Sequence, residues 1–218
     1  MKAIKERGKM MRFNDREEAA KQLTEKIKVD EPKNTIVLAM PRGGVPLGLT
    51  IADEFNIPLD VILAKKIGHP MNSEFAIGAM AEGGEPLIND DIHVSSTWLE
   101  KRVKQITDEI DRRRAIYSEV IEKQSLTDKH VILVDDGIAT GHTMFAAIES
   151  VRSKKPLSIS VAVPIIPEDT FKALEKVVDN IYYVQIPEAF LGSVSAYYEN
   201  FPQLDDYKVQ QLLGNQSI

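Results

Sequence analysis

Short runs rich in valine, isoleucine and leucine alternate along this chain with segments in which apolar residues recur at helical spacing. An apolar run of this kind has no polar face, so it fits a strand that is buried on both sides. Strands that alternate with helices predict an α/β protein with a parallel sheet covered on both faces. We assign strands to residues 35–40, 61–64, 76–82, 131–134, 157–166 and 180–187. We assign helices to residues 14–27, 45–55, 96–123, 142–153 and 168–177.

The remaining segments indicate how the chain is organised. Its 218 residues suffice for one sizeable core, and no glycine- or serine-rich linker divides them. We expect a single domain over residues 1–218, with a core at about 14–187 and a long helical insertion at about 96–123. Residues 67–75 combine turn-forming residues without periodicity, which predicts a mobile loop. The tail, about 188–218, departs from the alternating pattern, and we expect it to fold over the ligand end of the sheet as a hood or cap.

Charge and composition limit the classes of partner. The net charge is −6, so nonspecific binding to nucleic acid or to an anionic membrane is not favoured. The absence of cysteine removes disulfides, zinc–thiolate sites and thiol nucleophiles, and it fits a reducing cytoplasm. The basic first residues have no apolar stretch behind them, and no window approaches the ~20 apolar residues of a membrane span. We expect a cytoplasmic protein with no nucleic-acid partner and no membrane partner.

Residues 131–144 combine features that neither a surface turn nor a core requires. They read VILVDDGIATGHTM: a buried strand, two adjacent acids, and a loop of small residues before a helix. Gly137 and Gly141 permit backbone conformations that side chains forbid, and Thr140 and Thr143 add hydroxyl donors beside the free amides of the helix start. Because this loop lies at the carboxyl end of a strand, it predicts an anion site that suits a phosphate.

The two acids match another part of the same ligand. Ionised Asp135 and Asp136 only accept hydrogen bonds, and a vicinal diol offers two donors at short spacing. The pair therefore fits a ribose whose 5-phosphate is bound by the loop. The competing interpretation is an acidic turn without a ligand, since a strand, an acidic turn and a glycine at a helix start occur together in many α/β proteins.

Residues 131–144 resemble the phosphoribosyl-pyrophosphate (PRPP) signature of the type I phosphoribosyltransferases. Further stretches are similar, in order and spacing, to a subgroup of these enzymes known mainly from bacterial and archaeal genomes: RFNDREEAAKQL, MPRGGVPLG, AKKIGHPMNSEFAIGAMAEGG and the tail with YYENF. The resemblance covers nearly the whole chain. It implies a doubly wound, Rossmann-like parallel sheet with a C-terminal hood. The usual strand order in the family is 3-2-1-4-5, which makes strands one and four neighbours.

The resemblance also implies where the activated sugar binds. In such enzymes the loop after the first core strand binds pyrophosphate, here through Arg42 and the backbone of Gly43 and Gly44. Lys65 and Lys66 end the second expected strand, where the family commonly places cations that contact the pyrophosphate. The alternatives are an ordinary strand-to-helix turn for the first loop and solvated lysines for the pair.

The signature implies the remaining contacts. Asp135 and Asp136 are expected to hold the ribose, partly through Mg²⁺. The 5-phosphate is expected on the loop that follows, made by Gly137, Ile138, Ala139, Thr140, Gly141, His142 and Thr143. Hypoxanthine-guanine enzymes place an acid inside the signature, where this chain has Ala139. A positioned general base contributes about a hundred- to ten-thousand-fold in rate, so this departure argues against that subclass.

Three further segments carry weaker signals. The expected mobile loop corresponds to the family's flexible loop, which closes over the reacting centre and excludes water. Within it Glu74 is a candidate acid or base and His69 a candidate contact, although a surface role is the simpler interpretation of both. The charged stretch from Glu100 to Val120 reads as a solvated helix, with a dimer contact as the alternative. The aromatic tail is either a base-stacking hood or cap packing.

These expectations lead to one leading hypothesis and two competitors. The leading one is a cytoplasmic, Mg²⁺-dependent phosphoribosyltransferase that uses PRPP and a purine or pyrimidine base, with catalytic roles for Asp135, Asp136, Lys66 and Glu74. The family's usual state is a homodimer. The first competitor is a non-catalytic sensor that binds PRPP or a nucleotide in the same pocket and regulates a partner. The second is a sugar-phosphate or nucleotide hydrolase on a similar sheet.

Overall fold

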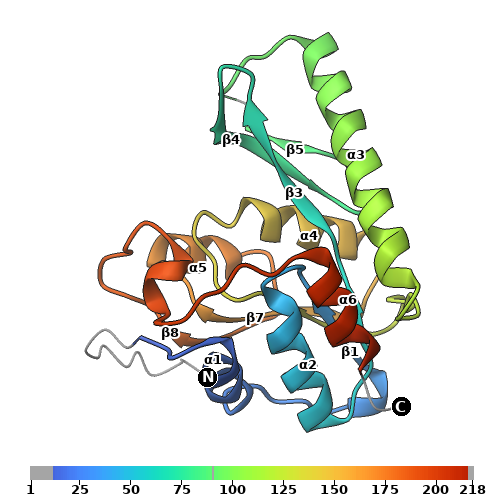
Figure 1. Cartoon of the computed structure of the whole chain (residues 1–218), viewed down its shortest axis with the longest axis vertical. Helices are drawn as coiled ribbons and strands as arrows, with labels where there is room; N and C mark the ends of the chain where they lie inside the picture. Colours follow the sequence, from blue (N-terminus) through green and yellow to red (C-terminus); the bar gives the residue numbers. More distant parts are fainter. Residues whose placement is uncertain (1–11, 90, 216–218) are drawn as a thin grey trace.

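A five-stranded parallel sheet forms the centre of the protein, whose computed structural model describes residues 12–89 and 91–215 (Figure 1). The strands lie in the order β2-β1-β6-β7-β8, and every neighbouring pair is parallel. Their bounds are Leu59–Val61 (β2), Thr35–Ala39 (β1), His130–Val134 (β6), Ser158–Ile165 (β7) and Asn180–Gln185 (β8). The expected neighbours β1 and β6 pair along their whole length, from Thr35↔His130 to Ala39↔Val134.

Helices cover both faces of this sheet, which confirms the predicted doubly wound α/β class. On one face, Val37 and Ala39 of β1 share a hydrophobic core with α1 (Arg16–Thr24) and α2 (Gly44–Phe55). On the other face, Ile36 and Leu38 pack with α4 (His142–Arg152) and α5 (Glu168–Leu174). Alternate residues of one strand therefore supply two separate cores, which explains why the strands carry no polar face. The described residues contain no helix long and apolar enough to cross a membrane.

A second sheet corrects two expectations from the sequence. A strand at residues 76–82 was expected in the parallel sheet, but residues 76–81 belong to β4 (Asn72–Ala81), which pairs antiparallel with β3 (Ala64–His69) and β5 (Leu87–Ile88). The strand order 3-2-1-4-5, which the family resemblance implies, is therefore wrong for this chain in its first position. The third expected strand lies in the second sheet, and β2 forms the edge of the central sheet.

The expected loop at residues 67–75 is the tip of the β3–β4 hairpin, where Gly68 pairs with Ala76 and His69 with Asn72. The turn-forming residues mark only the short connection between the two strands. Successive residues in the first half of β4 are exposed. This part of the strand therefore lacks the alternation of apolar and polar residues that would predict a strand.

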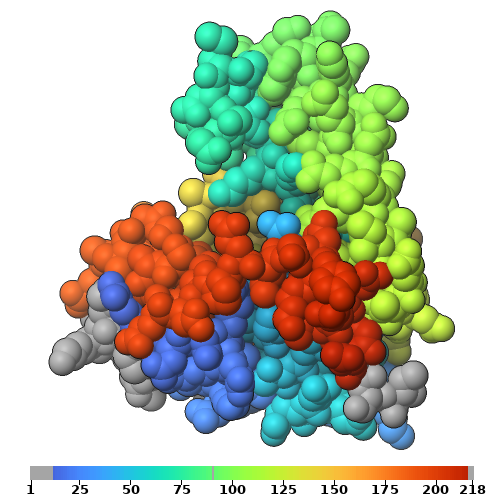
Figure 2. Space-filling model, viewed as in Figure 1, coloured from blue at the N-terminus to red at the C-terminus, as the bar shows by residue number. Residues whose placement is uncertain are grey.

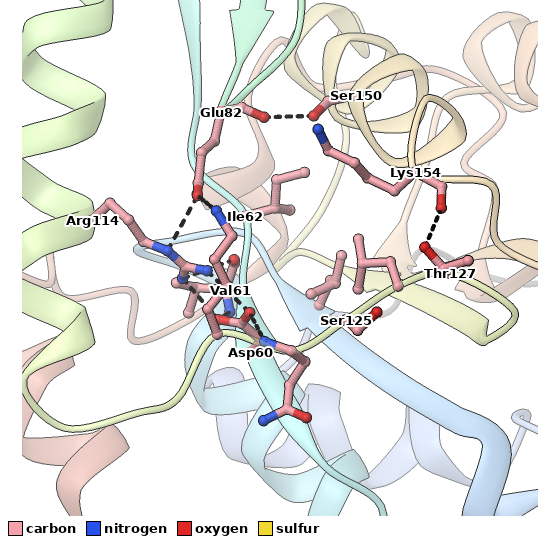
Figure 3. A pocket seen from close by; sticks show the side chains of 13 residues that line it. Asp60, Val61, Ile62, Glu82, Arg114, Ser125, Thr127, Ser150 and Lys154 are labelled. Carbon is pink, nitrogen blue, oxygen red and sulfur yellow. Dashed lines mark hydrogen bonds and ion pairs between the residues drawn. The ribbon is translucent and has the colours of Figure 1, made fainter.

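The second sheet and the long helix α3 (Ser96–Ser118) together project from the central sheet as an arm (Figure 1). A charge network fixes the base of this arm (Figure 3). Arg114 of α3 donates from Nη1 and Nη2 to the two carboxylate oxygens of Asp60 on β2, at 2.7 and 3.0 Å. Glu82, which follows β4, pairs with Arg114 at 3.2 Å and with Lys123 at 2.7 Å. A cavity of about 190 Å³ adjoins this network, over an apolar floor that includes Leu38.

The C-terminal residues lie across α1 and α2 (Figure 2), and a hydrogen bond from Tyr198 to Asp136 brings them to the carboxyl end of the sheet. They form the 3₁₀ helix η2 (Val194–Tyr197) and the helix α6 (Asp206–Gly214). The amide of Phe13 donates to the carbonyl of Tyr197 at 2.8 Å, and the hydroxyl of Tyr198 donates to the carbonyl of Asp136 at 2.6 Å. Tyr197 and Tyr198 are buried, so the structure favours packing over an open stacking face for these two rings.

Candidate functional site

The carboxyl ends of β1 and β6 bring two loops into contact that lie about ninety residues apart in the sequence. A Cβ atom on Gly43 would lie 1.9 Å from Oδ2 of Asp136, and one on Gly44 would lie 2.4 Å from the carbonyl oxygen of Val134. Only glycine allows the first loop to approach the acid pair this closely. The peptide bond between Pro41 and Arg42 in this loop is cis.

Asp135 and Asp136 lie side by side where β6 ends. The amide of Asp136 donates to Oδ1 of Asp135 at 2.8 Å. Burial raises the pKa of Asp135 well above its usual value, and the adjacent charge of Asp136 raises it further. Burial also raises the pKa of Asp136, while the guanidinium of Arg16 opposes that shift. Two adjacent and largely buried acids form a site that favours a cation or several hydrogen-bond donors.

The loop between β6 and α4 has the backbone geometry of an anion cradle. Gly137 has a φ of 153° and Gly141 a φ of 78°, a region that side chains rarely adopt. Gly141 is the N-cap of α4 and has no side chain to cap it, so the first amides of the helix remain available to a ligand. The carbonyl of Ala139 accepts from Thr170 at 2.9 Å, and Ile138 donates to Ile165 at 2.9 Å. These bonds hold the backbone of the loop in place.

Two side chains of this loop interact with each other and with β3. Thr140 Oγ1 lies 2.8 Å from His142 Nδ1, within hydrogen-bond distance. Burial lowers the pKa of His142, and the positive charge of Lys66 lowers it further. Lys66 therefore lies near the anion loop. It was predicted at the end of the second core strand, but it belongs to β3, because β2 already ends at Val61.

A cationic cavity of about 420 Å³ opens beyond the first loop, in the hollow between the arm and the C-terminal residues (Figure 2). Its charged lining consists of four cations and two acids: Arg42, Lys65, Arg112, Arg113, Glu109 and Asp206. Lys65 forms an ion pair with Glu109. Burial on its own would raise the pKa of Asp206, but Tyr117 and Arg113, which both donate hydrogen bonds to it, hold that pKa below its usual value. The lining thus keeps an excess of positive charge for an anionic ligand.

Glu74 and His69 lie apart from this centre, at the tip of the hairpin (Figure 1). The amide of Glu74 donates to Asn72 at 3.1 Å, and Nδ1 of His69 accepts from the amide of Met71 at 3.1 Å. Their hydrogen bonds within the described part of the chain are therefore local, and this conformation does not bring either side chain to the acid pair.

Several residues of the site were missed in the sequence. Arg16 binds Asp136 from the first turn of α1, although an arginine there looks like an ordinary surface residue. Arg112 and Arg113 line the cationic cavity, although their helix was interpreted as solvated. The only signal in the sequence was the run of three arginines at 112–114, and it did not indicate which side of the helix faces the site. Asp206 follows the stretch YYENF in the tail, and no motif marks this acid as part of the site.

Comparisons with known proteins agree with the fold. A family model described as a phosphoribosyl transferase domain matches residues 10–199. The crystal structure of TT1426 from Thermus thermophilus is 33% identical, covers 94% of this chain and 98% of that chain, and gives a TM-score of 0.79.

Two curated relatives have names that refer to an activity. "Putative phosphoribosyl transferase Rv0571c" of Mycobacterium tuberculosis is 33% identical over 208 residues, which are 94% of this chain and 47% of that protein. The bifunctional protein PyrR of Limosilactobacillus reuteri is 30% identical over 136 residues, which are 58% of this chain and 67% of that protein. The chain spans about half the length of the first of these relatives.

Proposed function

Because the chain belongs to the phosphoribosyl transferase domain family, we propose that it transfers the 5-phosphoribosyl group of PRPP to a nitrogenous base and releases pyrophosphate. One observation carries this proposal: the acid pair, the glycine-rich anion loop and the cationic cavity meet at the carboxyl ends of the neighbouring strands β1 and β6. They match the diol, the 5-phosphate and the pyrophosphate of one molecule.

The sugar phosphate is assigned to the β6–α4 connection. The 5-phosphate binds to the backbone amides of residues 137–143 and to the hydroxyls of Thr140 and Thr143, at the positive end of the α4 dipole. The two ribose hydroxyls donate to Asp135 and Asp136. A loop fixed by hydrogen bonds needs little reorganisation to bind an anion, which supports this assignment.

The pyrophosphate is assigned to the cationic cavity beside Gly43 and Gly44. Arg42 and Lys65 line that cavity, and Arg112 is available from α3 because its contact with Asp206 is only a 3.9 Å ion pair. Lys66, near the anion loop, is proposed to approach the pyrophosphate from the side of β3.

Mg²⁺ fits this site as a partner of the substrate. Among the described residues no group of three or more histidines, cysteines or acids could hold a metal ion, so the protein alone does not form a complete metal site. Mg²⁺ commonly binds to one or two carboxylates together with substrate phosphates, and Asp135 and Asp136 supply that pair. When bound, it would neutralise charge on the pyrophosphate.

The residues of the chain act mainly by orienting the sugar and stabilising charge. As the bond from C1 to pyrophosphate loosens, positive charge grows on the ribose ring and negative charge on the leaving group. Arg42, Lys65, Lys66 and the amides of the first loop stabilise the leaving group, and the acids hold the ring while a nitrogen nucleophile attacks C1. Glu74 remains a proposed acid or base, which requires movement of the hairpin. A purine or pyrimidine acceptor, a hood at residues 188–215 and a homodimer belong to the same proposal.

The test is pyrophosphate release with PRPP, Mg²⁺ and a panel of purine and pyrimidine bases. Release that requires one of the bases supports a transferase. Release without any base would indicate a hydrolase. Tight binding of PRPP without release across the panel would indicate a sensor. Asp136→Asn, measured in parallel by calorimetry, is expected to weaken PRPP binding while the protein stays folded.

A further inference from the structure

Arg16 holds Asp136 in a defined orientation. Its Nε donates to the carboxylate oxygen Oδ2 at 2.9 Å, and its Nη2 forms an ion pair with the same oxygen at 2.8 Å. Both side chains are nearly enclosed, with 11% of Arg16 and 13% of Asp136 exposed. Both of these contacts go to Oδ2, so Arg16 leaves the other oxygen of Asp136, Oδ1, without a contact from its guanidinium. One oxygen of this acid is therefore committed to the protein, and the other remains an acceptor for a ligand.

The same guanidinium ties Asp136 to the C-terminal residues. Its Nη1 donates to the carbonyl of Pro202 at 2.8 Å, and its central carbon lies 3.7 Å from the centre of the Phe201 ring. Phe201 in turn packs against Tyr198, with ring centres 4.7 Å apart. The hydroxyl of Tyr198 donates to the backbone of Asp136. The C-terminal residues thus reach Asp136 by two routes, one through its backbone and one through Arg16.

Gly43 limits the carboxylate from a further side. Because a Cβ atom on Gly43 would lie 1.9 Å from Oδ2, the carboxylate packs directly against the backbone of the first loop. Arg16 and Gly43 together therefore fix which oxygen of Asp136 faces an incoming ligand. An arginine fork over an aromatic ring performs this task better than a lysine, whose single ammonium is a flexible point charge.

We propose that Arg16 is a positioning residue that acts through Asp136. It reserves Oδ1 for a ribose hydroxyl and couples sugar binding to the placement of residues 198–202. This inference rests on the proposed function, because it takes the pentose diol as the ligand of Asp136. A purely structural arginine would also stabilise the fold, but its loss would affect all ligands alike and would not depend on Asp136.

The experiment is a double-mutant cycle on the full chain, with Arg16→Ala and Arg16→Lys made in the wild type and in Asp136→Asn. The dissociation constant of PRPP is measured by calorimetry with Mg²⁺, and the KM values of PRPP and of the accepted base are measured separately. Loss of a hydrogen bond between charged groups costs about 1.5–3 kcal/mol, which corresponds to roughly ten- to a hundred-fold. We expect Arg16→Ala to weaken PRPP binding by that factor, and Arg16→Lys to weaken it less.

Two features of the result identify a positioning role. In the Asp136→Asn background, Arg16→Ala should change the affinity for PRPP by no more than about twofold, because the residue through which it acts is already altered. In the Arg16→Ala variant, the KM of the base should also differ from the wild-type value by no more than about twofold. Arg152→Ala is the matched control, because this arginine also binds one acid, Glu149, and one carbonyl, that of Val177, but at the other end of α4.

The failures of the two proposals are distinguishable. If Asp136→Asn weakens PRPP binding and both Arg16 variants bind normally, the inference is wrong and the proposed function stands. An equal effect of Arg16→Ala in both backgrounds would also overturn the inference. If neither Asp136→Asn nor Arg16→Ala alters the affinity, the diol assignment itself is wrong. Should Arg16→Ala not fold, Phe201→Leu loosens the same guanidinium without removing it and is expected to weaken PRPP binding several-fold, whereas normal binding would contradict the proposal.

Discussion

Gly43→Ala tests whether the first loop and the acid pair form one site. The new Cβ would lie 1.9 Å from Oδ2, 2.4 Å from Cγ and 2.9 Å from Oδ1 of Asp136, while real Cβ atoms essentially never come within 3.0 Å of another heavy atom. The nearest carboxylate oxygen must therefore retreat by about 1 Å or more. It already lies at hydrogen-bond distance from two nitrogens of Arg16, so any such movement changes that contact.

The expected magnitudes follow from these contacts. Overpacking of this kind costs about 1–3 kcal/mol of unfolding free energy, which in a protein of this size lowers Tm by roughly 2–12 °C. Displacing the acceptor of a ribose hydroxyl costs about 1.5–3 kcal/mol of binding energy, or roughly ten- to a hundred-fold in the dissociation constant of PRPP. Calorimetry with Mg²⁺ measures the affinity, and a thermal melt measures the stability.

Gly48→Ala provides the matched control on the same helix. Its Cβ would lie 2.8 Å from Cβ of Ala39 and 3.1 Å from Leu59, so it overpacks the core without touching the acids. We expect a comparable loss of stability and normal affinity for PRPP. If Gly43→Ala binds PRPP as tightly as the wild type, or if Gly48→Ala loses affinity to the same degree, the first loop does not act through Asp136 and the reasoning is refuted.

Three further changes test other parts of the structure. Asp135→Asn should weaken PRPP binding and raise Tm at pH 7. Burial raises the pKa of Asp135 in the folded protein. Protonation of this carboxyl therefore contributes stability that is present below the ordinary value of 3.8 and is lost as the pH rises through the folded-state pKa. Melts of the variant should lack this decrease of Tm with rising pH. Arg112→Ala, at an exposed cation of the cavity, should weaken pyrophosphate binding about threefold or more in low salt and less in high salt, as measured by product inhibition. An unchanged inhibition constant would contradict the cavity assignment. Asp60→Asn breaks the buried pair with Arg114 and should cost about 3 kcal/mol, a Tm decrease of roughly 6–12 °C in thermal melts, and an unchanged Tm would show that the network does not fasten the arm.

The core of the site was predictable because its signals are local. Residues 131–144 contain the strand, the acids, the loop and the start of the helix within fourteen positions, and the structure places β6 and α4 accordingly. The pairing of β1 with β6 followed from the family resemblance, and it brought Gly43 to Asp136. In each case a short stretch of sequence determines its own conformation, and the strand order brings the two stretches together.

The remaining features depend on contacts between distant residues. Arg16 lies 120 positions from Asp136, and nothing in the first turn of a helix indicates which acid it will meet. The arm was not predicted because the first half of β4 is exposed and carries no alternating apolar pattern, while the buried second half resembles a strand of the central sheet. The cationic cavity joins β3, α3 and α6 with the first loop, so its charge excess became visible only once these elements were placed together.

The proposed site requires one pentose phosphate to span the acid pair and the anion loop. The decisive experiment is a crystal structure of the protein with PRPP and Mg²⁺. We expect the ribose hydroxyls within hydrogen-bond distance of Asp135 and Asp136, with the 5-phosphate on the amides of residues 137–143. A phosphate bound elsewhere, or a diol that leaves both acids without contact, would contradict it.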